Sequence, residues 1–127
     1  MGTKYLIDSN AIIDFFNGKL PYQGQQLLSG TEPVISIITY IELFSSNNIA
    51  IEEYQQLKRF ADMTTVHPVN LSIAAETIAI RKKYKIKLPD AVIAATAIVH
   101  NFTLITRNLS DFKMIDNLKS INPYKVQ

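Results

Sequence analysis

Four acidic residues are the candidates for chemistry in this chain: Asp8, Glu42, Asp90 and Asp111. They come from well-separated parts of the sequence. A cluster of carboxylates repels itself and is stable only when cations or protons neutralise it. Mg²⁺ and Mn²⁺ suit such a cluster, because they prefer oxygen ligands and complete their shells with water and substrate phosphate. If the four acids converge, they therefore predict metal-assisted hydrolysis of a phosphodiester bond by activated water.

Each of these acids also has a purely structural interpretation. Asp8 could help to cap the helix that follows it, and Glu42 could simply face solvent. Asp90 is favoured near a helix N-terminus by the helix dipole alone, and Asp111 could be a turn residue. Periodicity by itself leaves these alternatives open.

A sheet could bring the acids together, and the chain alternates predicted strands with predicted helices. Apolar and β-branched runs bounded by turn residues predict strands over 5–7, 34–37, 64–67 and 103–106, with a short fifth over 119–121. Helices are expected over 11–16 with Asn10 as N-cap, and over 22–28, 38–45, 51–61 and 88–99. Leu71, Ala74, Ala75, Ile78 and Ala79 predict an amphipathic helix that ends in the basic run 81–87. This alternation predicts an α/β fold with a mainly parallel sheet.

A parallel sheet would place several of the acids at one edge. The carboxyl ends of parallel strands share an edge, and ligands bind there in open α/β sheets. Asp8 and Asp111 follow predicted strands. Glu42 lies one helical turn after a third predicted strand, 34–37, so these three acids can converge. Asp90 joins them if its helix, with Pro89 in the first turn, begins at the same edge.

Length and composition limit the alternatives. The 127 residues, 47% of them hydrophobic, suit one domain, 1–127, with one core, and the net charge of +2 does not by itself indicate nucleic-acid binding. Cysteine is absent, which excludes disulfides and thiolate metal sites. We find no long apolar span and no signal-peptide layout, so we expect a soluble cytoplasmic protein without membrane contact. His67 and His100 lack a partner motif, and we interpret them as ordinary surface or half-buried residues.

Three motifs carry a resemblance to a known family. They begin as Leu6-Ile7-Asp8-Ser9-Asn10, Leu88-Pro89-Asp90-Ala91-Val92 and Leu104-Ile105-Thr106-Arg107-Asn108, the last continuing through Asp111 and Phe112. In this order they closely resemble the PIN-domain family, in particular the VapC-type toxins of type II toxin–antitoxin systems. The segment Thr39-Tyr40-Ile41-Glu42-Leu43 fits the family's second acidic position, and the resemblance covers essentially the whole chain.

This resemblance implies a fold, an activity and partners. The fold would be a PIN-like three-layer α/β/α arrangement around a mainly parallel sheet of four to five strands. The activity would be that of a Mg²⁺-dependent (or Mn²⁺-dependent) ribonuclease. The partners would be an RNA substrate, a small antitoxin that places a basic or polar residue near the acids, and a second copy of the chain in a homodimer. Catalytic and metal-binding roles fall to Asp8, Glu42, Asp90 and Asp111, with Ser9 and Asn108 in support. Two departures matter: Ser9 stands where threonine is commoner, and the position of the fourth acid varies across the family.

The basic run 81–87 directly precedes Asp90 and holds five of the thirteen Lys and Arg residues. We interpret it as a strip that contacts phosphates, and a solvated helix end that complements the dipole is the alternative. Lys83, Lys85, Lys87 and Arg107 are the candidate RNA-binding residues.

Three rival functions share part of this pattern. A PIN nuclease in RNA processing, without an antitoxin, would use the same residues. A haloacid-dehalogenase-like phosphatase needs a second aspartate two residues after Asp8, where this chain has Asn10. A non-enzymatic phospho-receiver domain needs a phospho-accepting aspartate after its middle strand, but His67 and Pro68 follow the third strand here. An absence of metal-dependent nuclease activity would favour the receiver or a non-enzymatic binding domain.

Overall fold

The computed structural model describes residues 2–126, which form short strands separated by helices. The elements are β1 (Tyr5–Ile7), α1 (Ser9–Phe16), α2 (Tyr22–Ser29), β2 (Val34–Ser36), α3 (Ile37–Phe44), α4 (Ile51–Asp62), β3 (Thr65–His67), α5 (Leu71–Lys83), α6 (Leu88–His100), β4 (Thr103–Ile105), the 3₁₀ turn η1 (Leu109–Asp111) and β5 (Lys119–Ile121). The predicted alternation of strands and helices is confirmed. None of the helices in the described part of the chain is long and apolar enough to cross a membrane.

All strand pairings among the described residues are parallel, as expected. The strands form two hydrogen-bonded groups, in the order β1-β4-β5 and β2-β3. Strands β1 and β2 lie side by side but belong to different groups, so the sheet is divided where a continuous one was expected. Within each group the strands are parallel and share a carboxyl edge. The two edges meet where Ser9, directly after β1 and Asp8, binds Glu42 on the helix that follows β2.

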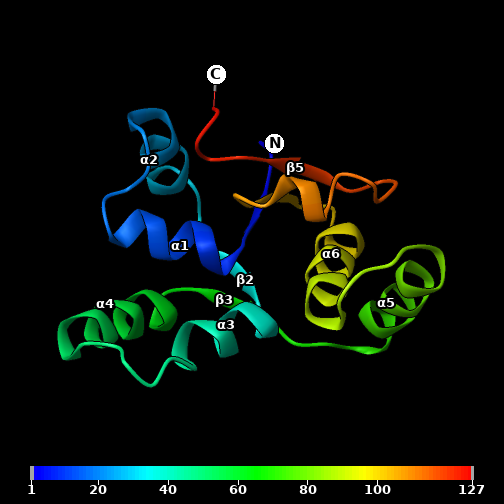
Figure 1. Ribbon diagram of the computed structural model, residues 1–127, viewed down its shortest axis with the longest axis horizontal. Coiled ribbons are helices and arrows are strands. Elements are labelled where there is room, and N and C mark those ends of the chain that lie inside the picture. The colour runs from blue at the N-terminus through cyan, green and yellow to red at the C-terminus, as the bar shows by residue number, and fades with distance from the viewer. Residues whose placement is uncertain (1, 127) are drawn as a thin grey trace.

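Two hydrophobic cores lie on opposite faces of the strands. Successive strand residues point to opposite faces, and accordingly Leu6 packs into one core and its neighbour Ile7 into the other. The same division separates Leu104 from Ile105 on β4. Figure 1 shows α5 and α6 on one side of the strands, with α1, α2 and α4 on the other. This arrangement is the expected three-layer α/β/α fold.

Helix α6 is buried along most of its length, which confirms the prediction from its apolar sequence. All residues from Ala91 to Ala97 are buried. Pro89 lies in the first turn, where its missing N–H costs no hydrogen bond. Asn101 ends the helix in the left-handed conformation, with φ 57°. Asp90 lies in the first turn of the helix, and the charge of Asp8 acts on it, so the helix begins at the carboxyl edge.

The beginnings of two helices differ from the sequence prediction. Helix α1 begins at Ser9 with Asp8 as N-cap, not Asn10, because the Asp8 carboxylate already accepts the Ser9 backbone N–H. Helix α3 begins at Ile37, one residue earlier than expected, because Ser36 Oγ accepts the Thr39 N–H. Asp8 directly follows β1 and Ser36 is the last residue of β2, so in both cases the polar residue at the end of the strand caps the helix.

The buried face of α5 also differs from the prediction. Ile73, Thr77 and Ile80 are buried, whereas Leu71 and Ile78 are 88% and 57% exposed. Helix α5 packs mainly against α6. This helix has apolar residues on more than one face. The face that packs against α6 is the one with Ile73, Thr77 and Ile80, and it does not include the residues predicted from sequence.

Candidate active site at the carboxyl edge of the sheet

Asp8 lies at the centre of the candidate site, directly after β1. Its side chain is 5% exposed and is held by three donors. The backbone N–H of Ser9 donates to Oδ1 at 2.8 Å, and Thr106 Oγ1 donates to Oδ2 at 2.9 Å. Asn10 Nδ2 also donates to Oδ2, at 3.2 Å. Asp8 is therefore both the helix cap and a buried carboxylate fixed in one orientation.

Thr106, which directly follows β4, was not among the predicted site residues. It is fully buried, and its hydroxyl accepts the backbone N–H of Asn108 at 3.1 Å and Asn10 Nδ2 at 3.4 Å. Because β1 pairs with β4 and Ile7 lies opposite Ile105, the residues that follow them, Asp8 and Thr106, become neighbours. A polar residue directly after a buried strand, as Thr106 is, could have been predicted from the sequence to lie at the site. The predicted supporting residue Asn108 contacts the site through its backbone.

Glu42 reaches the same edge from α3. Ser9 Oγ donates to Glu42 Oε1 at 3.1 Å, while the Ser9 backbone N–H is bound to Asp8. The predicted supporting residue Ser9 thus connects two of the four acids. Glu42 is exposed, so it forms the rim of the site. It therefore faces solvent and also belongs to the acid cluster, the two interpretations that the sequence left open.

The carboxylates interact electrostatically. Burial raises the pKa of Asp8, partly offset by its hydrogen bonds and by the positive charge of Arg107. Burial also raises the pKa of Glu42, with further contributions from the negative charges of Asp8 and Asp90. For Asp90, burial raises the pKa most, followed by the charges of Asp8 and Asp111, and Lys87 opposes them. The structure therefore brings these acids close enough for their charges to affect one another.

Asp111 is the most peripheral of the four. It is exposed, it lies on η1, and its backbone N–H donates to the Asn108 carbonyl at 3.0 Å. Among residues 2–126, its carboxylate makes no hydrogen bond or ion pair. Its charge still acts on Asp90, so it lies at the edge of the cluster.

The oxygen donors of this site fit a hard divalent cation. Within residues 2–126, no three acidic or histidine side chains stand close enough to hold a metal ion by themselves. Mg²⁺ does not require such a set, because it usually keeps several waters and binds through one or two carboxylates. The buried carboxylate of Asp8 beside Asp90 and Glu42 matches that chemistry. Burial raises the pKa of all three acids, although Arg107 acts against this at Asp8 and Lys87 acts against it at Asp90.

The four predicted RNA-contacting cations lie in different surroundings. Lys83 Nζ is bound to Asp116 at 2.7 Å, so its charge is already paired. Lys87 is the N-cap residue of α6 and lies near Asp90, whereas Lys85 is exposed. Arg107 is half exposed and binds a buried acid. Lys85 and Lys87 are therefore the members of the basic run that best fit a phosphate-contacting strip.

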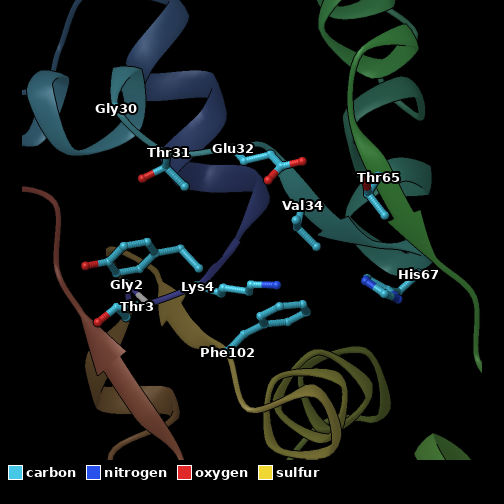
Figure 2. A pocket seen from close by; sticks show the side chains of 11 residues that line it. Gly2, Thr3, Lys4, Gly30, Thr31, Glu32, Val34, Thr65, His67 and Phe102 are labelled. Carbon is cyan, nitrogen blue, oxygen red and sulfur yellow. The ribbon is translucent and has the colours of Figure 1, made fainter.

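A separate hollow of about 490 Å³ lies away from the acids, near the beginnings of β1, β2 and β4 (Figure 2). Lys4 and Glu32 both line it, and His67 and Phe102 form another part of its wall. His67 and His100 are both half-buried, as expected, but they also pair with each other, with ring centroids 4.1 Å apart. Helix α6 carries His100 back toward the start of β4, where burial and His100 lower the pKa of His67. None of the four acids lines this hollow.

The family model of the PIN domain matches residues 5–118. The chain belongs to the PIN-domain family. This membership sets aside the phosphatase and phospho-receiver alternatives, and a comparison with curated proteins found no match.

Solved structures with the same PIN fold come from toxin–antitoxin complexes. A chain of a toxin–antitoxin complex from Klebsiella pneumoniae is 33% identical, with a TM-score of 0.78 over 97% of this chain and 100% of that one. VapBC-1 from nontypeable Haemophilus influenzae is 26% identical, with a TM-score of 0.77 and coverage of 97% and 100%. VapBC2 from Rickettsia felis, bound to a promoter DNA fragment, is 25% identical, with a TM-score of 0.76 and coverage of 94% and 98%. The predicted resemblance to VapC-type PIN proteins is confirmed.

Proposed function

We propose that this PIN protein is a Mg²⁺-dependent RNA endonuclease and the toxin of a toxin–antitoxin pair. The observation that carries the proposal is the buried Asp8 carboxylate, with Glu42 and Asp90 beside it at the carboxyl edge of the sheet. PIN membership supports nuclease chemistry, and the toxin–antitoxin complexes with the same fold support the toxin role.

In this proposal the acids have distinct roles. Asp8 and Asp90 hold the ion most directly, while Glu42 and Asp111 complete the charge cluster and help to orient the attacking water. When bound, Mg²⁺ or Mn²⁺ would supply water of lowered pKa and neutralise charge on the phosphodiester. Thr106 and the Ser9 backbone N–H fix the Asp8 carboxylate in advance, so little reorientation is needed during the reaction.

RNA would approach over the exposed cations that border the acids. Lys85 and Lys87 lie between α5 and α6, next to the beginning of the helix that carries Asp90. Cations that contact phosphates release counterions and so make the affinity salt-dependent. RNA as the substrate is part of the proposal and follows from the VapC-type resemblance.

An antitoxin needs a surface, and an apolar groove beside the ends of α1, α2 and α4 offers one. The groove has a volume of about 750 Å³, and Phe15, Phe16, Phe60 and Met63 contribute to its lining. Met63 is 76% exposed, and exposed apolar patches of this kind mark protein interaction sites. We therefore place an apolar segment of the antitoxin in this groove.

The partner is tested by co-expression with the small gene next to this one. Met63→Glu should weaken a stable, inactive complex, whereas Met114→Glu changes an exposed methionine outside the groove and should leave the complex intact. A solitary gene would favour the RNA-processing role. Self-association as a homodimer is tested on the purified protein by light scattering.

The nuclease itself is tested by cleavage of a mixed RNA pool with Mg²⁺, Mn²⁺ or chelator. Asp8→Asn keeps the shape of the side chain and a good N-cap but removes its charge. It should abolish cleavage, while Asp62→Asn, at an exposed acid on α4, should cleave like the parent. Cleavage by Asp8→Asn at the parent rate, or parent activity that survives chelation, would refute the metal-nuclease proposal.

A further inference from the structure

A second buried acid, Asp14, lies on α1 beside the candidate site and is absent from the set of four. Asp14 is 2% exposed, and its Oδ2 receives two hydrogen bonds. Arg107 Nη1 donates at 2.9 Å, and the Tyr124 hydroxyl donates at 2.8 Å. Three residues from distant parts of the chain thus meet at one carboxylate oxygen.

This contact differs from an ordinary surface ion pair. A buried carboxylate is costly unless it is paired and hydrogen-bonded, and Asp14 satisfies that requirement through Arg107 and Tyr124. The side chain of Arg107 remains 49% exposed. Its Nε and second Nη make no hydrogen bond to any residue of the 2–126 segment, so one end of the guanidinium is anchored and the other faces solvent.

The backbone of Arg107 lies beside the acid cluster. The backbone N–H of Arg107 donates to Asn10 Oδ1 at 3.1 Å, and Nδ2 of the same Asn10 donates to Asp8 Oδ2 at 3.2 Å. The charge of Arg107 acts on the Asp8 carboxylate. A substrate phosphate that approached Asp8 would therefore come under the influence of the Arg107 charge, and the exposed guanidinium keeps donors free to bind it.

Tyr124 is held in place from the C-terminal segment. Its backbone N–H donates to Asn122 Oδ1 at 2.9 Å, and the preceding residue, Pro123, is buried against α2. Gly24 on α2 makes this approach possible, because an added Cβ there would collide with the Pro123 carbonyl oxygen. The Tyr124 hydroxyl is a donor because a phenol is protonated at neutral pH, and the hydrogen bond to Asp14 raises its pKa further.

We propose that Asp14 and Tyr124 are positioning residues that hold Arg107 as a phosphate-binding cation of the candidate site. The inference rests on the proposed nuclease function. An arginine guanidinium binds phosphate through parallel N–H donors in a fixed plane. Anchoring one of its nitrogens on a buried acid orients the remaining donors before the substrate arrives, which lowers the entropic cost of binding.

The test measures binding separately from cleavage. A labelled single-stranded RNA is titrated in chelator, and fluorescence anisotropy gives its affinity over a range of salt concentrations. Arg107→Gln should weaken binding about tenfold, as expected for one charge-assisted hydrogen bond, and should reduce the salt slope by about 0.7. Tyr124→Phe removes only the hydroxyl and should weaken binding severalfold while keeping the salt slope, whereas Tyr22→Phe, at an exposed tyrosine, should match the parent.

A double-variant experiment separates positioning from general destabilisation. In the Arg107→Gln background, adding Asp14→Asn or Tyr124→Phe should leave RNA affinity unchanged, because both residues act through Arg107. With Mg²⁺ present, Tyr124→Phe should raise KM more than it lowers kcat.

Different results would overturn different parts of the reasoning. If Arg107→Gln keeps the parent affinity and salt slope, Arg107 does not bind phosphate. If Tyr124→Phe and Asp14→Asn both bind like the parent while Arg107→Gln does not, the positioning role is refuted. Either result leaves the nuclease proposal standing, whereas a parent protein that neither binds nor cleaves RNA refutes both.

Discussion

The hydroxyl of Thr106 provides a sharp test of how the site holds a buried charge. Thr106→Val replaces this hydroxyl with a methyl group of similar size at a fully buried position. The variant loses the donor to Asp8 Oδ2, at 2.9 Å, and the acceptor of the Asn108 N–H, at 3.1 Å. It also loses a weaker hydrogen bond from Asn10 Nδ2 at 3.4 Å.

The magnitude follows from these hydrogen bonds. A hydrogen bond to a charged group contributes about 1.5–3 kcal/mol, and an unsatisfied buried polar group costs about 1–3 kcal/mol. Asn108 is exposed, so water can reach its N–H and reduce the cost of leaving that donor without a protein acceptor. We therefore expect Thr106→Val to lower the free energy of unfolding by about 2–3 kcal/mol at neutral pH in chelator. Domains of this kind are stable by about 5–15 kcal/mol, so the variant should remain folded.

The loss of unfolding free energy caused by Thr106→Val should also depend on pH. The pKa of Asp8 is raised by burial in the folded protein, and losing the Thr106 donor raises it further. A carboxyl group with a raised folded-state pKa destabilises the protein above that pKa, and the penalty is relieved as pH falls toward the ordinary value of 3.8. Once Asp8 is protonated, the missing hydrogen bond is a neutral one worth about 0.5–1.5 kcal/mol. The cost of Thr106→Val should thus shrink by about 1 kcal/mol on acidification.

Urea unfolding of the parent, Thr106→Val and Thr106→Ser over this pH range provides the assay. Thr106→Ser keeps the hydroxyl and removes a buried methyl, which should cost about 1 kcal/mol at every pH. If the valine variant is no less stable than the serine variant at neutral pH, or if its cost does not change with pH, the hydroxyl does not support the charge of Asp8.

Three further predictions concern the acids and the basic strip. Asp90→Asn should largely remove the rise in melting temperature that saturating Mn²⁺ gives the parent; an equal rise in both proteins would contradict a metal role for Asp90. Glu42→Gln should raise the stability of the metal-free protein at neutral pH, because it removes a charge that acts on its neighbours, and a loss of stability in thermal unfolding would contradict this. Replacing Lys85 and Lys87 with glutamine should reduce the salt slope of RNA binding by about 0.7 for each phosphate that the variant no longer binds. Lys83→Gln should change the slope less, because Lys83 is paired with Asp116. Equal slopes in the parent and both variants would refute a phosphate-contacting role for Lys85 and Lys87.

Local patterns in the sequence determined the elements of the fold and the placement of the acids on them. Strand candidates followed by polar residues predicted Asp8 at the end of β1, and Pro89 with an apolar run predicted a buried helix beginning near Asp90. These predictions succeeded because burial and capping depend on residues a few positions apart. The rule that parallel strands share a carboxyl edge then predicted that the acids converge. Their catalytic roles remain predictions.

The tertiary structure decided what depends on packing between distant segments. Helix α5 buries Ile73 instead of Leu71, because its packing against α6 selects among several apolar sides. Two histidines without a local motif meet because α6 and β3 bring them together. No local pattern indicated that Tyr124 reaches Asp14, since 110 positions separate them and only the packing of the C-terminal segment on α2 closes the distance. Short stretches of sequence carry no information about such pairs, because their geometry arises only when the layers have packed.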